Sequence, residues 1–134
     1  MKFNYYDSCL LTAICLTAGN KNGTDLKGII SYIDYLDHSI ITWNEVSSGL
    51  SKLKKIGAIT EKDQHLFLSA KFNKWWTKTY LTKKNIRAAK QVDEVNEYLD
   101  KTYSATQGNH TVVKIKLSEE DFHAALKEYK QVPA

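Results

Sequence analysis

One stretch decides the fold of this chain: residues 41–68, which read ITWNEVSSGLSKLKKIGAITEKDQHLFL. Its start has the pattern of a helix N-terminus. Thr42 and Glu45 are three residues apart, so each side chain can satisfy an unpaired backbone amide of the first helical turn. Apolar residues then recur at helical spacing up to Ile56. We therefore predict a helix over residues 43–56.

The second half of this stretch predicts a tight β-hairpin. Gly57 supplies the left-handed residue that commonly ends a helix. Beyond it, the apolar runs 58–60 and 66–68 flank the polar connection 61–65. Two short runs separated by a few polar residues are typical of antiparallel strands joined by a short loop.

Two more helices are predicted before this unit. The first covers residues 8–18, with Asp7 as its N-cap, and the second covers residues 25–37, with Thr24 as its N-cap. Both carry apolar residues at helical spacing. The order of the elements is therefore helix, helix, helix, hairpin.

After the hairpin, two further helices are expected. Ser69 is placed to cap the first of them, and Thr82 is placed to cap the second, which covers residues 83–103. The first helix carries aromatic residues at helical spacing, namely Phe72, Trp75, Trp76 and Tyr80. We expect these rings to pack in the core rather than to stack on nucleic-acid bases.

The end of the chain predicts one strand and one helix. Residues 111–117 alternate between apolar and polar side chains, as a half-buried strand does, and Ser118 and Asp121 start a last helix. The expected fold class is mainly α with a small β-hairpin. Residues 1–69 form its core, and residues 70–134 form a C-terminal helical extension that packs on this core or mediates dimerisation.

The element order, together with the runs TWNEV (42–46) and LSKLKKIGAI (50–59), resembles the winged helix-turn-helix superfamily. The sequence looks most like the small bacterial regulators of the MarR and PadR type. The resemblance covers about residues 7–69. It implies that the helix over residues 43–56 enters the major groove of DNA, while the hairpin, called the wing, touches the adjacent backbone or minor groove.

We therefore expect a cytoplasmic bacterial protein that binds double-stranded DNA, as a transcriptional regulator. The candidate DNA contacts lie on the polar side of the third helix and on the hairpin: Asn44, Ser47, Ser48, Ser51, Lys52, Lys55 and Lys62. The same polar side also fits an ordinary solvated helix face. The wing tip is expected to be net negative, because Lys62 stands between Glu61 and Asp63, and phosphates would repel such a tip.

The charge of the chain is uneven. The formal net charge is +4, and the segment from Lys71 to Lys90 contains basic residues and no acidic residue. Arg87 is the only Arg, so the bidentate contacts that Arg makes with guanine are nearly excluded. Further phosphate contacts are possible on the basic segment, at Lys71, Lys74 and Lys78. An ordinary solvated helix face is the alternative for these lysines.

A narrow helix-packing seam is predicted in the second helix after the hairpin. Its apolar residues recur at alternating spacings of four and three, at Ala88, Val92, Val95 and Leu99. Dimeric regulators pair their recognition helices on two-fold DNA sites, so a homodimer through this region is expected. Packing of the seam within its own chain is the alternative. A non-enzymatic module that binds a protein partner is the second functional hypothesis.

Enzymatic chemistry is not expected. The sequence contains no glycine-rich phosphate loop, nucleophile elbow or metal-ligand spacing, so no catalytic residue, cofactor or metal is predicted. Cys9 and Cys15 would be about 9 Å apart along one helix, too far for a disulfide. They are expected to be small core residues in a reducing compartment. The apolar run 9–18 is too short to span a membrane.

Overall fold

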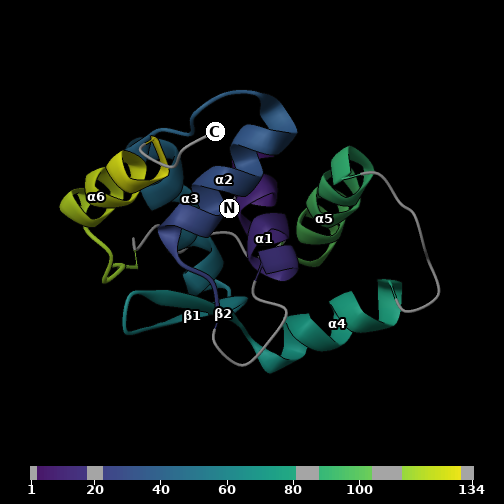
Figure 1. Ribbon diagram of the computed structural model, residues 1–134. Helices are drawn as coiled ribbons and strands as arrows, with labels where there is room; N and C mark the ends of the chain where they lie inside the picture. The colour runs from purple at the N-terminus through teal and green to yellow at the C-terminus, as the bar shows by residue number, and fades with distance from the viewer. Residues whose placement is uncertain (1–2, 18–22, 81–87, 104–112, 131–134) are drawn as a thin grey trace.

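The computed structural model describes residues 3–17, 23–80, 88–103 and 113–130. Within these ranges the chain is mainly helical and has one two-stranded antiparallel sheet (Figure 1). The elements, in chain order, are α1 (Tyr5–Thr17), α2 (Leu26–Asp37), α3 (Trp43–Lys55), β1 (Ile59–Lys62), β2 (His65–Leu68), α4 (Ala70–Tyr80), α5 (Ala88–Tyr103) and α6 (Glu119–Lys130). A mainly α class with a small hairpin is thereby confirmed.

Helix α1 starts three residues earlier than predicted. Its first turn is closed by a reciprocal pair: the Asp7 amide donates to Asn4 Oδ1 at 2.9 Å, and the Asn4 amide donates to Asp7 Oδ2 at 2.8 Å. Asp7 is therefore not the N-cap, as the sequence predicted, but a residue within the first turn. Asn and Asp are about equally good N-caps, so the helix begins at the earlier of the two.

Helix α2 is capped by Asp25 and not, as predicted, by Thr24. The Asp25 side chain accepts from the Gly28 amide at 2.8 Å. Thr24 instead forms a bridge with Leu66 of β2, and each backbone amide donates to the carbonyl of the other residue. At its other end, α2 stops at His38, whose φ of 54° is left-handed.

Helix α3 and the hairpin follow the local signals closely. Thr42 and Glu45 form the predicted capping box, and Gly57 has the predicted left-handed backbone, with φ of 76°. The strands pair with Ile59 opposite Leu68, and a two-residue turn, Asp63–Gln64, joins them. Both turn residues have positive φ, as in the type I′ turns that suit right-twisted hairpins. The strands thus extend further into the polar connection than predicted.

The core surrounds α1, which contacts α2, α3, β2 and α5. Figure 1 shows α1 between α2 and α5. Four helices contribute side chains with no exposed surface, among them Leu10 and Ile14 from α1, Ile33 from α2, Leu50 from α3 and Val95 from α5. Burial of aliphatic side chains of this size stabilises a fold by about 1.5 to 3 kcal/mol each. These residues therefore hold the N-terminal helices and α5 together.

A close approach of α1 and α3 leads to a first prediction. A Cβ atom added to Gly49 would lie 2.3 Å from Leu10 Cδ1 and 3.0 Å from Asp7 Oδ1, and both neighbours are buried. Overpacking of this kind costs about 1 to 3 kcal/mol, whereas Ala gains about 1 kcal/mol of helix propensity over Gly. Gly49→Ala should therefore lower the free energy of unfolding, measured in urea, by up to about 2 kcal/mol. A gain in stability would show that the two helices are not in contact here.

The C-terminal part packs on the N-terminal helices. Ser69 caps α4 as predicted, since its Oγ accepts from the Phe72 amide at 3.2 Å. Helix α5 lies on α1, and α6 lies on α2. The Tyr129 hydroxyl of α6 donates to Asp34 of α2, and the Phe122 ring lies 5.9 Å from that of Trp43.

The prediction of an extra strand over residues 111–117 is wrong: residues 113–117, the part of this range that the structure describes, form no strand. Residues 113–118 form neither helix nor strand, and Lys116 lies at a bend; we call this segment the strap. Its side chains do alternate, with Leu117 buried and Lys114 and Lys116 exposed. Instead of pairing with another strand, the backbone of the strap forms hydrogen bonds with side chains of α3 and β1. The predicted cap of α6 is confirmed, because Ser118 and Asp121 accept from each other's amides.

Several predictions fall on residues outside the described ranges. These are the end of the first helix at Ala18, the cap at Thr82, the start of the following helix over residues 83–87, and residues 111–112. The side chains of Tyr80 and Ala88 also lie outside the description.

The buried cysteines and one tyrosine lead to a second prediction. Cys9 and Cys15 are unpaired and buried, as expected. Burial raises the pKa of the Cys9 thiol to about 11 and that of the Tyr32 hydroxyl to about 12, from ordinary values of 9.0 and 10.0. Above about pH 9 the unfolded chain releases these protons while the folded chain keeps them, so stability falls as the pH rises towards 12.

Urea unfolding at a series of pH values would measure this loss. The midpoint should decrease between about pH 9 and about pH 11, and Cys9→Ala should make the decrease shallower because one of the groups is gone. A midpoint that is constant over this range would contradict the burial of these groups.

Candidate nucleic-acid interface

The outward side of α3 is only partly open. Asn44 and Ser48 are exposed, whereas Ser47, Ser51 and Lys55 are half-buried. The Ser47 hydroxyl donates to the carbonyl of Asn44 within the same helix. The structure thus leaves Asn44 and Ser48 as the candidate base contacts with the best access.

The strap covers one flank of α3. The Ser51 hydroxyl donates to the Val113 carbonyl at 2.6 Å, and Lys54 Nζ donates to the Lys114 carbonyl at 3.2 Å. Of these two residues, Ser51 was a predicted DNA contact and Lys54 was not. Ser51 is therefore engaged by the chain's own C-terminal region in this conformation.

Lys52 has a structural role that the sequence did not predict. Its Nζ donates to Asp7 Oδ2 of α1. The Asp7 side chain is 1% exposed and that of Lys52 is 22% exposed. The charge of Lys52 therefore balances a buried carboxylate, and this lysine is a poor phosphate contact.

The wing tip is not the net-negative surface that the sequence suggested. The Glu61 side chain is 3% exposed and forms an ion pair with Lys54 at 3.2 Å. Only Lys62 and Asp63 of the three charged residues remain exposed. The predicted repulsion of phosphates assumed that Glu61 is exposed at the wing tip. That assumption is wrong, because the Glu61 side chain turns inwards.

The basic and the aromatic residues of α4 differ in their exposure to solvent. Lys71, Lys74 and Lys78 are exposed. Phe72 is buried, and the Trp75 ring stacks on Tyr98 of α5 with centroids 4.0 Å apart. The prediction that these two aromatics pack in the core is confirmed, and Trp76 is half-buried beside Trp75.

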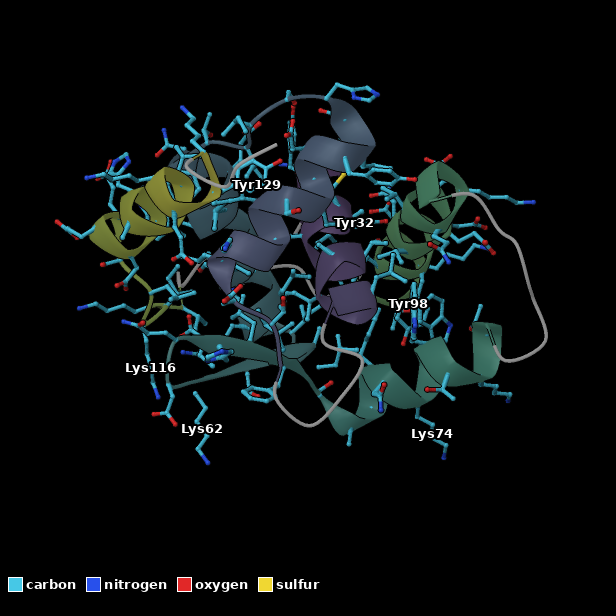
Figure 2. All side chains as sticks on the ribbon, viewed as in Figure 1. Tyr32, Lys62, Lys74, Tyr98, Lys116 and Tyr129 are labelled. Carbon is cyan, nitrogen blue, oxygen red and sulfur yellow. The ribbon has the colours of Figure 1, made fainter. Side chains whose placement is uncertain are left out.

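The hairpin and α4 present lysines on the same side of the molecule. Figure 2 shows Lys62, Lys74 and Lys116 pointing away from the body where the hairpin and α4 lie. We call the exposed lysines of the hairpin and α4 the basic edge; they are Lys62, Lys71, Lys74 and Lys78. Lys114 and Lys116 of the strap were missed as candidates. Their alternate positions in residues 111–117 were the available signal, since they place both lysines on the outward side.

The predicted dimer seam is not an exposed surface in this structure. Val92 is 1% exposed, and Val95 and Leu99 have no exposed surface, because α5 packs on α1 of the same chain. The alternative of packing within one chain is the observed arrangement. The expected homodimer thereby loses this interface.

In the part of the chain that is described, no three His, Cys, Asp or Glu residues are grouped so as to hold a metal ion. Over the same residues, no helix has both the length and the apolar character needed to cross a membrane. In comparisons with known proteins, no family model, curated protein or solved structure matches this chain.

Proposed function

We propose that this protein binds double-stranded DNA and acts as a transcriptional regulator with a winged helix-turn-helix arrangement. In this proposal α2 and α3 form the helix-turn-helix, and the hairpin is the wing. The observation that carries the proposal is the basic edge, where Lys62, Lys74 and Lys78 are exposed while Glu61 is turned inwards. Lysines placed along an exposed edge are suited to the regularly spaced phosphates of a duplex.

Base reading is the smaller part of the proposed binding. Asn44 and Ser48 are exposed on α3 and can donate and accept hydrogen bonds, whereas Ser51 and Lys52 are engaged within the chain. Phosphate contacts supply affinity, and base contacts supply specificity. We therefore expect moderate affinity with a weak sequence preference.

Fluorescence anisotropy of a labelled mixed-sequence duplex at low salt would test this proposal. We expect saturable binding at micromolar protein, with competition by unlabelled duplex. An anisotropy that does not change at micromolar protein would remove the proposal.

A variant of α3 would separate the two kinds of contact, and this is a third prediction. Asn44→Ala should reduce the difference in affinity between preferred and random duplexes, because it removes a base-reading amide. It should leave the salt dependence of binding unchanged, since no charge is lost. A change in the salt dependence would contradict the division of roles between α3 and the basic edge.

One observation favours the second functional hypothesis, a module that binds a protein partner. Tyr35 at the end of α2 is 73% exposed, and Tyr5 and Ile40 near this end are also exposed. Exposed aromatic residues are enriched at protein interfaces. If Tyr35→Ser abolished a cellular phenotype while duplex binding was unchanged, the protein-partner hypothesis would be favoured.

A further inference from the structure

We propose that Glu61 is a positioning residue: its buried carboxylate fixes the strap so that Lys114 and Lys116 extend the basic edge. This inference rests on the proposed DNA-binding function, which it deepens. It assigns a role to Glu61, one of the two hairpin carboxylates that were expected to oppose DNA binding. It also adds two lysines that the candidate interface lacked.

The carboxylate of Glu61 joins three separate parts of the chain. Its Oε2 accepts from the Lys116 amide at 2.7 Å and from Lys54 Nζ at 3.2 Å, and its Oε1 lies 3.5 Å from the Leu117 amide. The side chain is 3% exposed, so water does not compete for these contacts. A buried carboxylate needs such partners, because an unpaired buried charge is strongly unfavourable.

Contacts with α3 complete the attachment of the strap. Ser51 and Lys54 of α3 donate to the carbonyls of Val113 and Lys114, and Leu117 is 5% exposed. Exposure alternates along the strap from residue 114 to residue 117, where Leu117 is buried. Lys114 and Lys116 are exposed accordingly. Figure 2 shows Lys116 projecting near Lys62 at the hairpin.

Fixing the strap before binding favours association. A loose strap would have to be ordered when its lysines met phosphates, and this ordering would reduce the affinity. Glu61 therefore contributes to binding of an anion although it is itself negative. A purely electrostatic role predicts the opposite sign, because removal of any nearby carboxylate should strengthen binding.

Two isosteric variants distinguish these roles. Glu61→Gln and Asp63→Asn each remove one negative charge from the hairpin, and Asn tolerates the left-handed backbone at position 63. Only the first disturbs the strap, because an amide group cannot accept from both strap amides and from Lys54. We expect Asp63→Asn to raise the affinity for a mixed-sequence duplex by about twofold. Glu61→Gln should lower it by about tenfold. An affinity for Glu61→Gln that is unchanged or raised would overturn the proposal.

Hydrogen exchange of the strap supplies a second readout that needs no DNA. In Glu61→Gln the amides of Lys116 and Leu117 should exchange at least about tenfold faster than in the native chain, while Asp63→Asn should leave them unchanged. Unchanged protection in Glu61→Gln would overturn the positioning role. If the native chain bound no duplex, the proposed function would fail, and this exchange measurement would still decide whether Glu61 holds the strap.

Discussion

Replacement of Lys52 by Met should lower the free energy of unfolding by about 3 kcal/mol. This loss is large for a lysine on the polar side of a helix. The substitution keeps the length of the side chain but leaves Asp7 without its cation in a site that is 1% exposed. Asp7 Oδ1 is already buried without a hydrogen-bond partner among the described residues. Among the described residues, the buried carboxylate would then keep the Asn4 amide and the helix N-terminus as its stabilising contacts.

Urea unfolding followed by circular dichroism would measure this loss. Lys62→Met is the matched control, because Lys62 is exposed on the hairpin and should change stability by less than about 0.5 kcal/mol. The double variant Asp7→Asn with Lys52→Met should recover part of the loss, since a neutral amide needs no counter-ion. A loss below about 1 kcal/mol for Lys52→Met would show that the ion pair is not formed.

This ion pair also decides how DNA binding should be tested. Lys52→Glu would place a second carboxylate against buried Asp7 and would destabilise the fold. Loss of DNA binding in that variant would therefore report unfolding, not a lost phosphate contact. Charge reversals belong on exposed lysines instead.

Charge reversal on the basic edge should weaken duplex binding by at least about tenfold. The variant Lys62→Glu with Lys74→Glu changes one exposed lysine of the hairpin and one of α4. Each lysine that contacts a phosphate contributes about 0.9 to the slope of log K against log salt. The slope should therefore become shallower by about 2 in the double variant.

The matched control carries the same change in charge on a different helix. Lys127→Glu with Lys130→Glu alters two exposed lysines near the end of α6, where Tyr129 contacts α2. Both double variants lower the formal net charge by four, from +4 to zero. We expect the α6 variant to retain most of the affinity. Equal losses in the two variants would mean that net charge alone, and not the basic edge, drives binding.

The sequence predicted best the features that neighbouring residues determine. The capping box at Thr42 and Glu45, the left-handed Gly57 and the hairpin depend on contacts within a few residues, and they are present. Asp7 shows how a local signal is ambiguous. It has a residue type suited to an N-cap, but Asn4 lies in position to take that role three residues earlier.

The candidate site was predicted less well, because its state depends on contacts between distant residues. Periodicity placed Lys52 on the polar side of α3, but it could not show that α1 brings Asp7 against it. Likewise, the charge of Glu61 could be read from the sequence, whereas its burial beneath the strap could not. The regular spacing of Val92, Val95 and Leu99 indicated a buried stripe and left its partner, α1, undetermined.

The salt dependence of duplex binding by the native chain tests the central claim most directly. Fluorescence anisotropy at a series of salt concentrations gives the slope of log K against log salt. If the basic edge and the strap contact about four to six phosphates, this slope should be about −4 to −5. A slope near zero, or no binding at the lowest salt, would contradict the claim that this surface binds duplex DNA.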